Sequence, residues 1–432
     1  MARKLAVFLI FLLAAAMRLN AEDPQAWARA NLDSLVSLYR HFHSHPELSL
    51  QEKETSAWLA AELKSAGFDV TTGIGGYGLV GLLNNGDGPV LMLRTDMDAL
   101  PVTEKTGLAY ASKIVAKMGT GEEVGVMHAC GHDLHMTNLV GAARYLAANK
   151  QGWRGTLMVI GQPAEERGEG AKAMLDDGLF TRFPKPDFAL ALHVDAKLAA
   201  GRVGYCPGFS FANVDTVDIT MHGKGGHGAA PQMTIDPVVQ ASELVMALQT
   251  IVSREIKPGE PAVVTVGSIH GGSQHNIISD SCHLQLTVRS YSEEVRAHLL
   301  EAIKRKANSI AAGARAKEPT VVVSVGLPSL WNDEKLTGLA VQVFKRALGN
   351  GNVLLDDPWM GGEDFSRYGR AGVPIFMYML GTTDPKRLES LEKQGQTPHP
   401  VHSSYYYPDV DEALVTGITT MTQAAIELLK RQ

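Results

Sequence analysis

The chain has little cysteine, no excess of positive charge and no internal repeat. Three cysteines among 432 residues are too few for a disulfide framework. A formal net charge of -6 offers no basic surface for nucleic acid or anionic lipid, so polyanionic partners are not expected. The lack of repeats or stalk-like sequence argues against a structural or adhesive role.

The longest hydrophobic run lies at the N-terminus. Arg3 and Lys4 precede an apolar stretch over residues 5–16, which resembles a secretory signal peptide. This stretch is too short to span a bilayer comfortably. We therefore expect residues 1–21 to be a signal peptide, cleaved after Ala21 or alternatively after Ala16. The mature protein is then exported, to the periplasm or the medium, and has no membrane anchor.

The rest of the chain has globular composition, with 45% hydrophobic and 20% charged residues. Its length exceeds what one hydrophobic core usually supports, which favours two domains. Apolar runs at 90–93, 156–160, 188–192 and 374–379 are typical of strands covered on both faces. Helical spacing occurs at 134–148 and 411–429. These patterns predict an α/β fold: a mostly parallel sheet flanked by helices, built from residues 22–210 and 329–432.

The succession of predicted strands and helices changes over residues 211–328. The pattern predicts strand, helix, strand, strand, helix and strand, at 214–221, 237–255, 262–269, 282–290, 293–312 and 319–325. That order is typical of a ferredoxin-like α+β domain. We expect it to be an inserted lid or dimerisation domain.

Polar residues follow three of the predicted strands of the larger domain. Asp96 follows the first strand, Glu165 and Glu166 follow the second, and His193 ends the third. Ligands of open α/β sheets bind at the carboxyl ends of the strands. The sequence therefore predicts a site at this edge of the sheet.

Cys130 and His132 lie on either side of Gly131 at the start of a predicted helix. A thiolate and an imidazole at this spacing favour a borderline-soft divalent ion such as zinc. The alternative is a buried thiol and a core histidine. His135 falls on a similar helix face and could support a ligand instead of binding metal, and His128 could be purely structural.

Glu165 and Glu166 suggest a division of labour. In extended backbone their side chains point in opposite directions, so one carboxylate could bind metal while the other takes a proton from water. A solvated pair on a loop is the alternative.

His193 could be an ordinary strand-end histidine, and the sequence alone does not choose between His399 and His402. Cys206 and Cys282 could pair but are more simply read as buried apolar cysteines.

The inserted domain carries a glycine-rich loop around His227. A histidine presented by glycines could reach a site and stabilise an oxyanion, although a flexible connection is the alternative. Asn276 and Arg289 could bind a substrate carboxylate, Arg289 through a bidentate contact. A lone arginine at a strand end is more often solvated.

The chain resembles the M20 metallopeptidase family, in particular its subfamily D of amidohydrolases, which includes hippurate, N-acyl amino acid and auxin-conjugate hydrolases. The motifs that carry the resemblance occur in order along the chain, at residues 40–47, 96–101, 128–135, 162–166, 225–231, 361–365 and 401–402. In the wider family a histidine ligand takes the place of Arg94, whereas subfamily D uses the Cys-x-His pair, as does this chain.

The resemblance implies a two-metal amidohydrolase that uses Zn, Mn, Co or Ni and cleaves N-acyl amino acids into a carboxylic acid and an amino acid. It implies one set of metal ligands, namely Cys130, His132, Glu166, His193 and His402. It further implies that Glu165 is the general base, that Asp96 orients the site, and that His227, often from the partner subunit of a homodimer, polarises the carbonyl. A dipeptidase or aminopeptidase of the same clan, or a catalytically silent metal- or solute-binding protein, are the alternatives.

Overall fold

A computed structural model describes residues 22–430 of the chain. The predicted signal peptide and both of its cleavage sites lie outside the described residues. None of the helices within 22–430 has the length and apolarity needed to cross a membrane.

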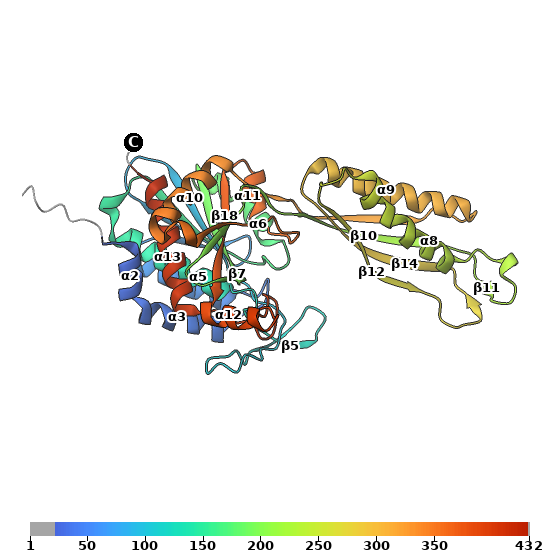
Figure 1. Cartoon of the computed structure of the whole chain (residues 1–432), viewed down its shortest axis with the longest axis horizontal. Coiled ribbons are helices and arrows are strands. Elements are labelled where there is room, and N and C mark those ends of the chain that lie inside the picture. Colours follow the sequence, from blue (N-terminus) through green and yellow to red (C-terminus); the bar gives the residue numbers. More distant parts are fainter. Residues whose placement is uncertain (1–21, 431–432) are drawn as a thin grey trace, which may run out of the picture.

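The larger part of the molecule is built on an eight-stranded sheet (Figure 1). Its four central strands run parallel, and the strands on the β1 side are antiparallel. The predicted α/β class is therefore confirmed. In spatial order the strands are β1 (Asp69–Ile74), β2 (Gly78–Asn84), β6 (Thr156–Gln162), β3 (Val90–Asp96), β7 (Phe188–Ala199), β18 (Ile375–Thr383), β8 (Val203–Tyr205) and β17 (Val353–Leu355).

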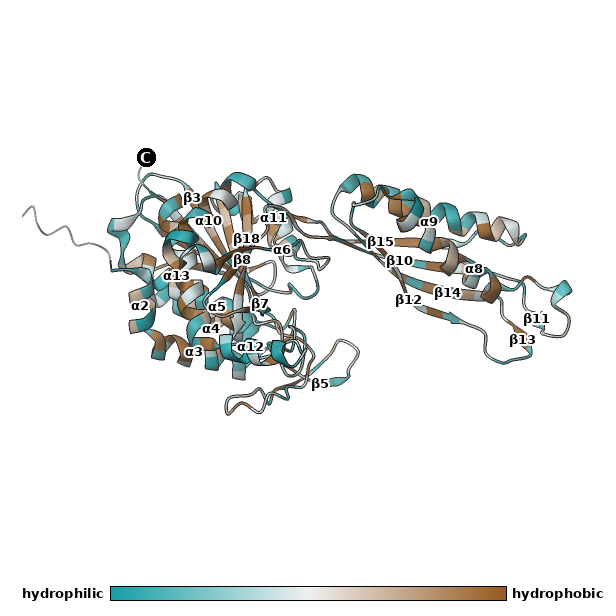
Figure 2. Cartoon of the chain, viewed as in Figure 1, coloured by the Kyte–Doolittle hydropathy of each residue, from teal (hydrophilic) through white to brown (hydrophobic). Residues whose placement is uncertain are grey.

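Helices cover both faces of this sheet, which explains the unbroken apolar runs. In β3, Leu91 and Leu93 pack into one core cluster, while Met92 between them packs into the other. Figure 2 shows these central strands as mostly hydrophobic. The first face carries α2 (Pro24–Ala30), α3 (Leu32–Ser44), α4 (Lys53–Ser65), α5 (His132–Ala148), α10 (Glu334–Leu348) and α13 (Val410–Leu428). The second carries α6 (Gly170–Asp176), α7 (Leu179–Arg182) and α11 (Ser366–Arg370).

The smaller part extends away from the large sheet (Figure 1). Its four strands are all antiparallel, in the order β12, β14, β10, β15, which is the ferredoxin-like arrangement. One face is covered by two helices and buries alternate residues of β10 and β14. In chain order the elements are β10 (Asn213–His222), α8 (Pro237–Thr250), β12 (Ala262–Gly271), β14 (Ser281–Ser290), α9 (Glu293–Gly313) and β15 (Thr320–Leu327).

Short paired strands complete the structure. β11 (Gly226–His227) pairs with β13 (Ile277–Ile278) at the end of the small domain that lies farthest from the large sheet (Figure 1). β9 (Gly208–Phe211) pairs with β16 (Leu330–Asn332), so the chain leaves the large domain and re-enters it along one ribbon. β4 (Val115–Lys117) and β5 (Glu123–Gly125) form a hairpin, and α12 (Pro385–Lys393) precedes the loop that contains His402.

Candidate metal centre

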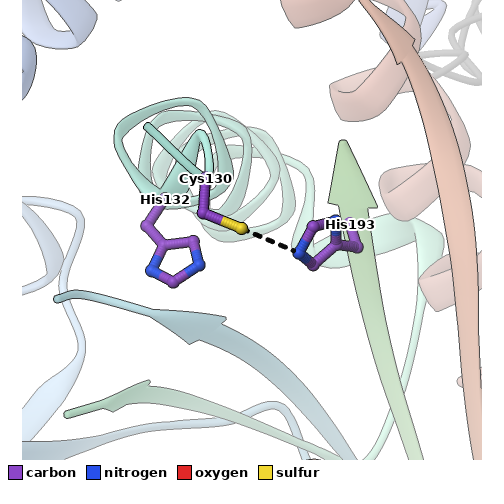
Figure 3. Close-up of side chains that lie close together, drawn as sticks. All are labelled: Cys130, His132 and His193. Carbon is purple, nitrogen blue, oxygen red and sulfur yellow. Dashed lines mark hydrogen bonds between the residues drawn. The ribbon is translucent and has the colours of Figure 1, made fainter. Parts of the chain in front are cut away.

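Cys130, His132 and His193 meet at the carboxyl edge of the large sheet (Figure 3). The first two flank the start of α5, and His193 comes from β7, with 3.4 Å between Cys130 Sγ and His193 Nε2. Gly131 between them has φ of 75°, and a Cβ there would lie 2.7 Å from Val194 Cγ2. Only glycine therefore allows the thiol and the imidazole to turn toward one point.

Both of these imidazoles are oriented by backbone carbonyls. His132 Nδ1 donates to the carbonyl of Asp98 and His193 Nδ1 to that of Val194, each at 2.8 Å. In the neutral imidazole, Nε2 is then the nitrogen that can bind a metal ion, and that of His193 faces Cys130 Sγ at 3.4 Å. His132 Nε2 and Glu166 Oε1 are buried and have no hydrogen-bond partner among residues 22–430. Buried polar atoms without partners are costly, so this donor set fits a bound cation.

The two glutamates do not point in opposite directions, which corrects the sequence prediction. The segment after β6 is a turn and not a strand, because Ala164 has φ of 50°. Glu165 Oε2 lies 3.9 Å and Glu166 Oε1 3.8 Å from His132 Nε2. Both carboxylates thus reach the same cluster. Asp98 fixes the turn by accepting a hydrogen bond from the Glu166 amide at 3.0 Å.

His402 reaches the cluster and His399 does not. His402 Nε2 lies 3.4 Å from Glu166 Oε1, and the His402 amide donates to the Ala129 carbonyl at 2.7 Å. The backbone at His402 is left-handed, with φ of 70°. His399 instead packs against Tyr405, with 5.2 Å between the ring centroids. Cys130, Glu166 and His402 form a second group of convergent ligand atoms.

Asp96 lies beside the candidate ligands, with 3.7 Å between its Oδ2 and His132 Nε2, and forms a further convergent group with His132 and His135. Its Oδ2 accepts from Arg94 Nη1 at 2.8 Å, and its Oδ1 pairs with His135 Nδ1 at 2.6 Å. His135 Nε2 accepts from the Val194 amide at 3.0 Å. Both ring nitrogens of His135 are therefore occupied, which places this residue behind the ligands. His128 is buried, and neither of its ring nitrogens has a partner among the described residues.

The pKa values reflect a surplus of buried negative charge. Burial, followed by Glu166 and Glu165, raises the pKa of Cys130 well above its usual value. Burial opposes protonation of His132, but Asp96 and Asp98 outweigh it and raise the pKa of His132 to about 10. Burial and then Glu363 raise the pKa of Glu165. Divalent cations would neutralise this surplus and favour the thiolate.

The three predicted residues of the small domain lie elsewhere. His227 is exposed on β11, and the carbonyl of Asn276 beside it accepts from the Gly228 amide at 2.8 Å. Arg289 is half-buried near the other end of β14, where its Nε donates to Thr287 Oγ1 at 3.0 Å. Within one chain, His227 therefore does not reach the candidate metal ligands. The prediction that a partner subunit contributes His227 to the site stays a prediction.

Sequence reasoning missed several buried groups around the site. Glu363 and Asp364 each accept from Arg94 Nη2, at 3.0 and 3.1 Å. His43 is held between Asp133, at 2.7 Å, and Glu104, at 3.2 Å. The Glu-Asp pair stands within one of the resembling motifs, whereas nothing in the sequence distinguishes Glu104 from a surface carboxylate. All three cysteines are buried and free, so Cys206 and Cys282 do not pair.

Comparison with known proteins decides the family. The profile described as peptidase family M20/M25/M40 matches residues 92–427. The chain belongs to this family. The resemblance to M20 enzymes is thus confirmed, and this protein is a metal-dependent amidohydrolase.

Three relatives show which kinds of M20 protein this chain is similar to. The chain is 38% identical to the N-acetyl-L-cysteine deacetylase of Bacillus subtilis (strain 168) over 339 residues, which are 77% of each protein. It is 38% identical to the hippurate hydrolase of Campylobacter jejuni over 330 residues, 76% of this chain and 82% of the relative. A solved structure, the YxeP protein of Bacillus subtilis, is described as a dinuclear metal-binding M20 peptidase. It superposes with a TM-score of 0.76 at 29% identity, covering 93% of this chain and 99% of that one.

Proposed function

We propose that this protein hydrolyses the amide bond of N-acyl amino acids and releases a carboxylic acid and an amino acid. The observation that carries the proposal is the position of Glu165. A buried carboxylate with a raised pKa lies 3.9 Å from a histidine that is itself oriented to bind metal. Such a base beside a metal site is what hydrolysis by activated water requires.

The names of two relatives support the substrate class. An N-acetyl-L-cysteine deacetylase and a hippurate hydrolase both act on the amide of an N-acylated amino acid, and each is 38% identical to this chain. Two divalent ions, of Zn, Mn, Co or Ni, are proposed from the dinuclear site of the solved relative. The residues that would hold them are Cys130, His132, Glu166, His193 and His402.

When bound, the ions supply Lewis-acid activation of water and of the amide carbonyl. The protein supplies proton transfer and orientation. Glu165 accepts the proton of the attacking water and then delivers it to the leaving amine. Asp96 keeps His135 in place behind the ligands through the 2.6 Å contact. His227 of the partner subunit would stabilise the oxyanion, and Asn276 and Arg289 would bind the substrate carboxylate.

A substrate panel tests the proposal. Purified, metal-loaded protein is assayed against N-acetyl, N-benzoyl and long-chain acyl amino acids and against free dipeptides. We expect hydrolysis of the acylated substrates. Cleavage confined to dipeptides would show instead the peptidase alternative.

Glu165→Ala tests the base. We expect unchanged metal content and a fall in kcat of roughly 100- to 10,000-fold, because general-base catalysis typically contributes that much. Glu169→Ala is the matched control, since this glutamate is half-exposed and pairs with Arg167 outside the ligand cluster. Full turnover by Glu165→Ala would remove Glu165 from the mechanism.

We also propose that the protein is exported and that it forms a homodimer through the small domain. N-terminal sequencing of protein recovered outside the cytoplasm tests export, and a start at Glu22 or Met17 would identify the cleavage site. Light scattering coupled to size exclusion tests the dimer. A full-length N-terminus or a monomeric mass would contradict the respective proposal.

A further inference from the structure

The carboxylate of Glu165 is buried, since the residue is only 7% exposed. Among residues 22–430, no side chain or backbone amide donates a hydrogen bond to its oxygens, and His132 Nε2 lies 3.9 Å from Oε2. One oxygen each of Glu165, Glu363 and Asp364 also lie within 4.8 Å of one another. The position of this base must therefore depend on its charged neighbours.

These two neighbours are bound differently. Asp364 has both oxygens engaged: Oδ1 accepts from Arg94 Nη2 at 3.1 Å and Gln162 Nε2 at 2.6 Å, and Oδ2 accepts from the Ala171 amide at 2.9 Å. Glu363 is engaged on one oxygen alone. Its Oε1 accepts from Arg94 Nη2 at 3.0 Å and from the Phe365 amide at 2.9 Å. Of the four carboxylate oxygens of Glu363 and Asp364, Glu363 Oε2 is therefore the one that accepts no hydrogen bond from residues 22–430.

Arg94 makes this arrangement possible. Its guanidinium is fully buried and also binds Gln162 Oε1 at 3.0 Å and Asp96 at 2.8 Å. One cation thereby fixes groups from β3, from the end of β6 and from the segment before α11. A fixed negative charge behind a carboxylate that lacks hydrogen bonds repels it in one direction, and burial weakens the screening of that repulsion.

We propose that Glu363 is a positioning residue for Glu165. Held by Arg94, its carboxylate repels that of Glu165 and keeps it turned toward the metal ligands. This inference rests on the proposed function only in that it takes Glu165 to be the general base.

Glu363→Gln tests the inference. Glutamine keeps the acceptor for Arg94 and Phe365, but it replaces the repelling oxygen with an amide that donates a hydrogen bond. In a crystal structure of the metal-loaded variant we expect the Glu165 carboxylate to move toward residue 363. We expect kcat to fall at least about 10-fold, with KM within about twofold and the metal-to-protein ratio unchanged. Glu169→Gln, on the neighbouring surface, is the matched control.

A purely structural role for Glu363 would give another result. Glu165 would stay in place while the melting temperature fell, and that outcome, or an unchanged kcat, overturns the proposal. If Glu363→Gln does not fold, Glu363→Asp is the second variant. It keeps the negative charge but holds it farther from Glu165. We then expect the Glu165 carboxylate to move less, and kcat to fall less, than in Glu363→Gln. The crystallographic comparison does not require a known substrate, so failure of the substrate panel would leave this test intact.

Discussion

The two candidate halves of the site are built in opposite ways. At the edge of the large sheet, His132 and His193 each donate to a backbone carbonyl and Asp98 holds the Glu166 amide. At the far end of the small domain, His227 is exposed on a two-residue strand. The side chains of the first half converge within one chain, and His227 lies apart from them.

Desolvation explains the difference. Buried charges and imidazoles require partners within the fold, so the residues around Arg94 and Asp96 must be assembled whenever the protein is folded. An exposed imidazole is solvated and carries no such cost. His227 can therefore lie far from the buried cluster without such a cost.

Among the variants that compare the two halves of the site, the largest loss of turnover is expected for Cys130→Ser. This change removes a soft ligand from the buried cluster, so bound metal should fall and kcat/KM should drop by more than about 100-fold. Cys282→Ser, a buried cysteine of β14, is the matched control and should keep its metal. Elemental analysis and activity are measured together, and an unchanged metal-to-protein ratio would remove Cys130 from the ligand set.

A smaller loss is expected for His227→Ala, with kcat about 100-fold lower because one oxyanion donor is removed. Metal content and melting temperature should not change. If the partner subunit supplies His227, mixing inactive Glu165→Ala with inactive His227→Ala subunits should restore about a quarter of wild-type activity, since half of randomly mixed dimers carry one intact site. No recovery after verified subunit exchange would mean that each chain uses its own His227.

The smallest effect on turnover, and a clear one on stability, is expected for His43→Gln. Burial opposes protonation of His43, but Asp133 and Glu104 outweigh it and raise its pKa to about 9. The pKa of His43 in the folded protein exceeds the ordinary 6.5, so protonated His43 stabilises the folded state. This stabilisation is full below pH 6.5 and is lost as the pH rises through about 9. The shift corresponds to about 3 kcal/mol.

Urea unfolding of wild type and His43→Gln between pH 6 and 10 measures this contribution. The difference in the free energy of unfolding should shrink as the pH rises. Tyr39 and Tyr110 also contact His43, so the profile is read below their ionisation. His222→Gln in the small domain, where His222 Nε2 meets Thr320 Oγ1 at 3.0 Å, is the control. A constant difference across this range would show that His43 is not protonated in the folded protein.

Local patterns predicted much of the fold. The apolar run at 90–93 gave the core of β3, and the alternation at 214–221 gave all but the ends of β10. The predicted helix 237–255 is α-helical to Thr250 and π-helical from Ile251 to Glu255. β1 was not predicted, because this edge strand has mixed burial and lacks a strong period. β2, which is mostly buried between β1 and β6, was not predicted either, because two glycines interrupt its apolar run.

The sequence by itself determined the family, the order of the main strands and helices and the chemical types at the edge of the sheet, because these depend on residue identity and spacing. The tertiary structure decided what spacing cannot encode. It turned Glu165 and Glu166 toward one cluster through a turn at Ala164, and it brought Glu363 and Asp364 to Arg94 from nearly 270 residues away. It also left His227 apart from the candidate metal ligands, since an exposed group needs no partner within its own chain.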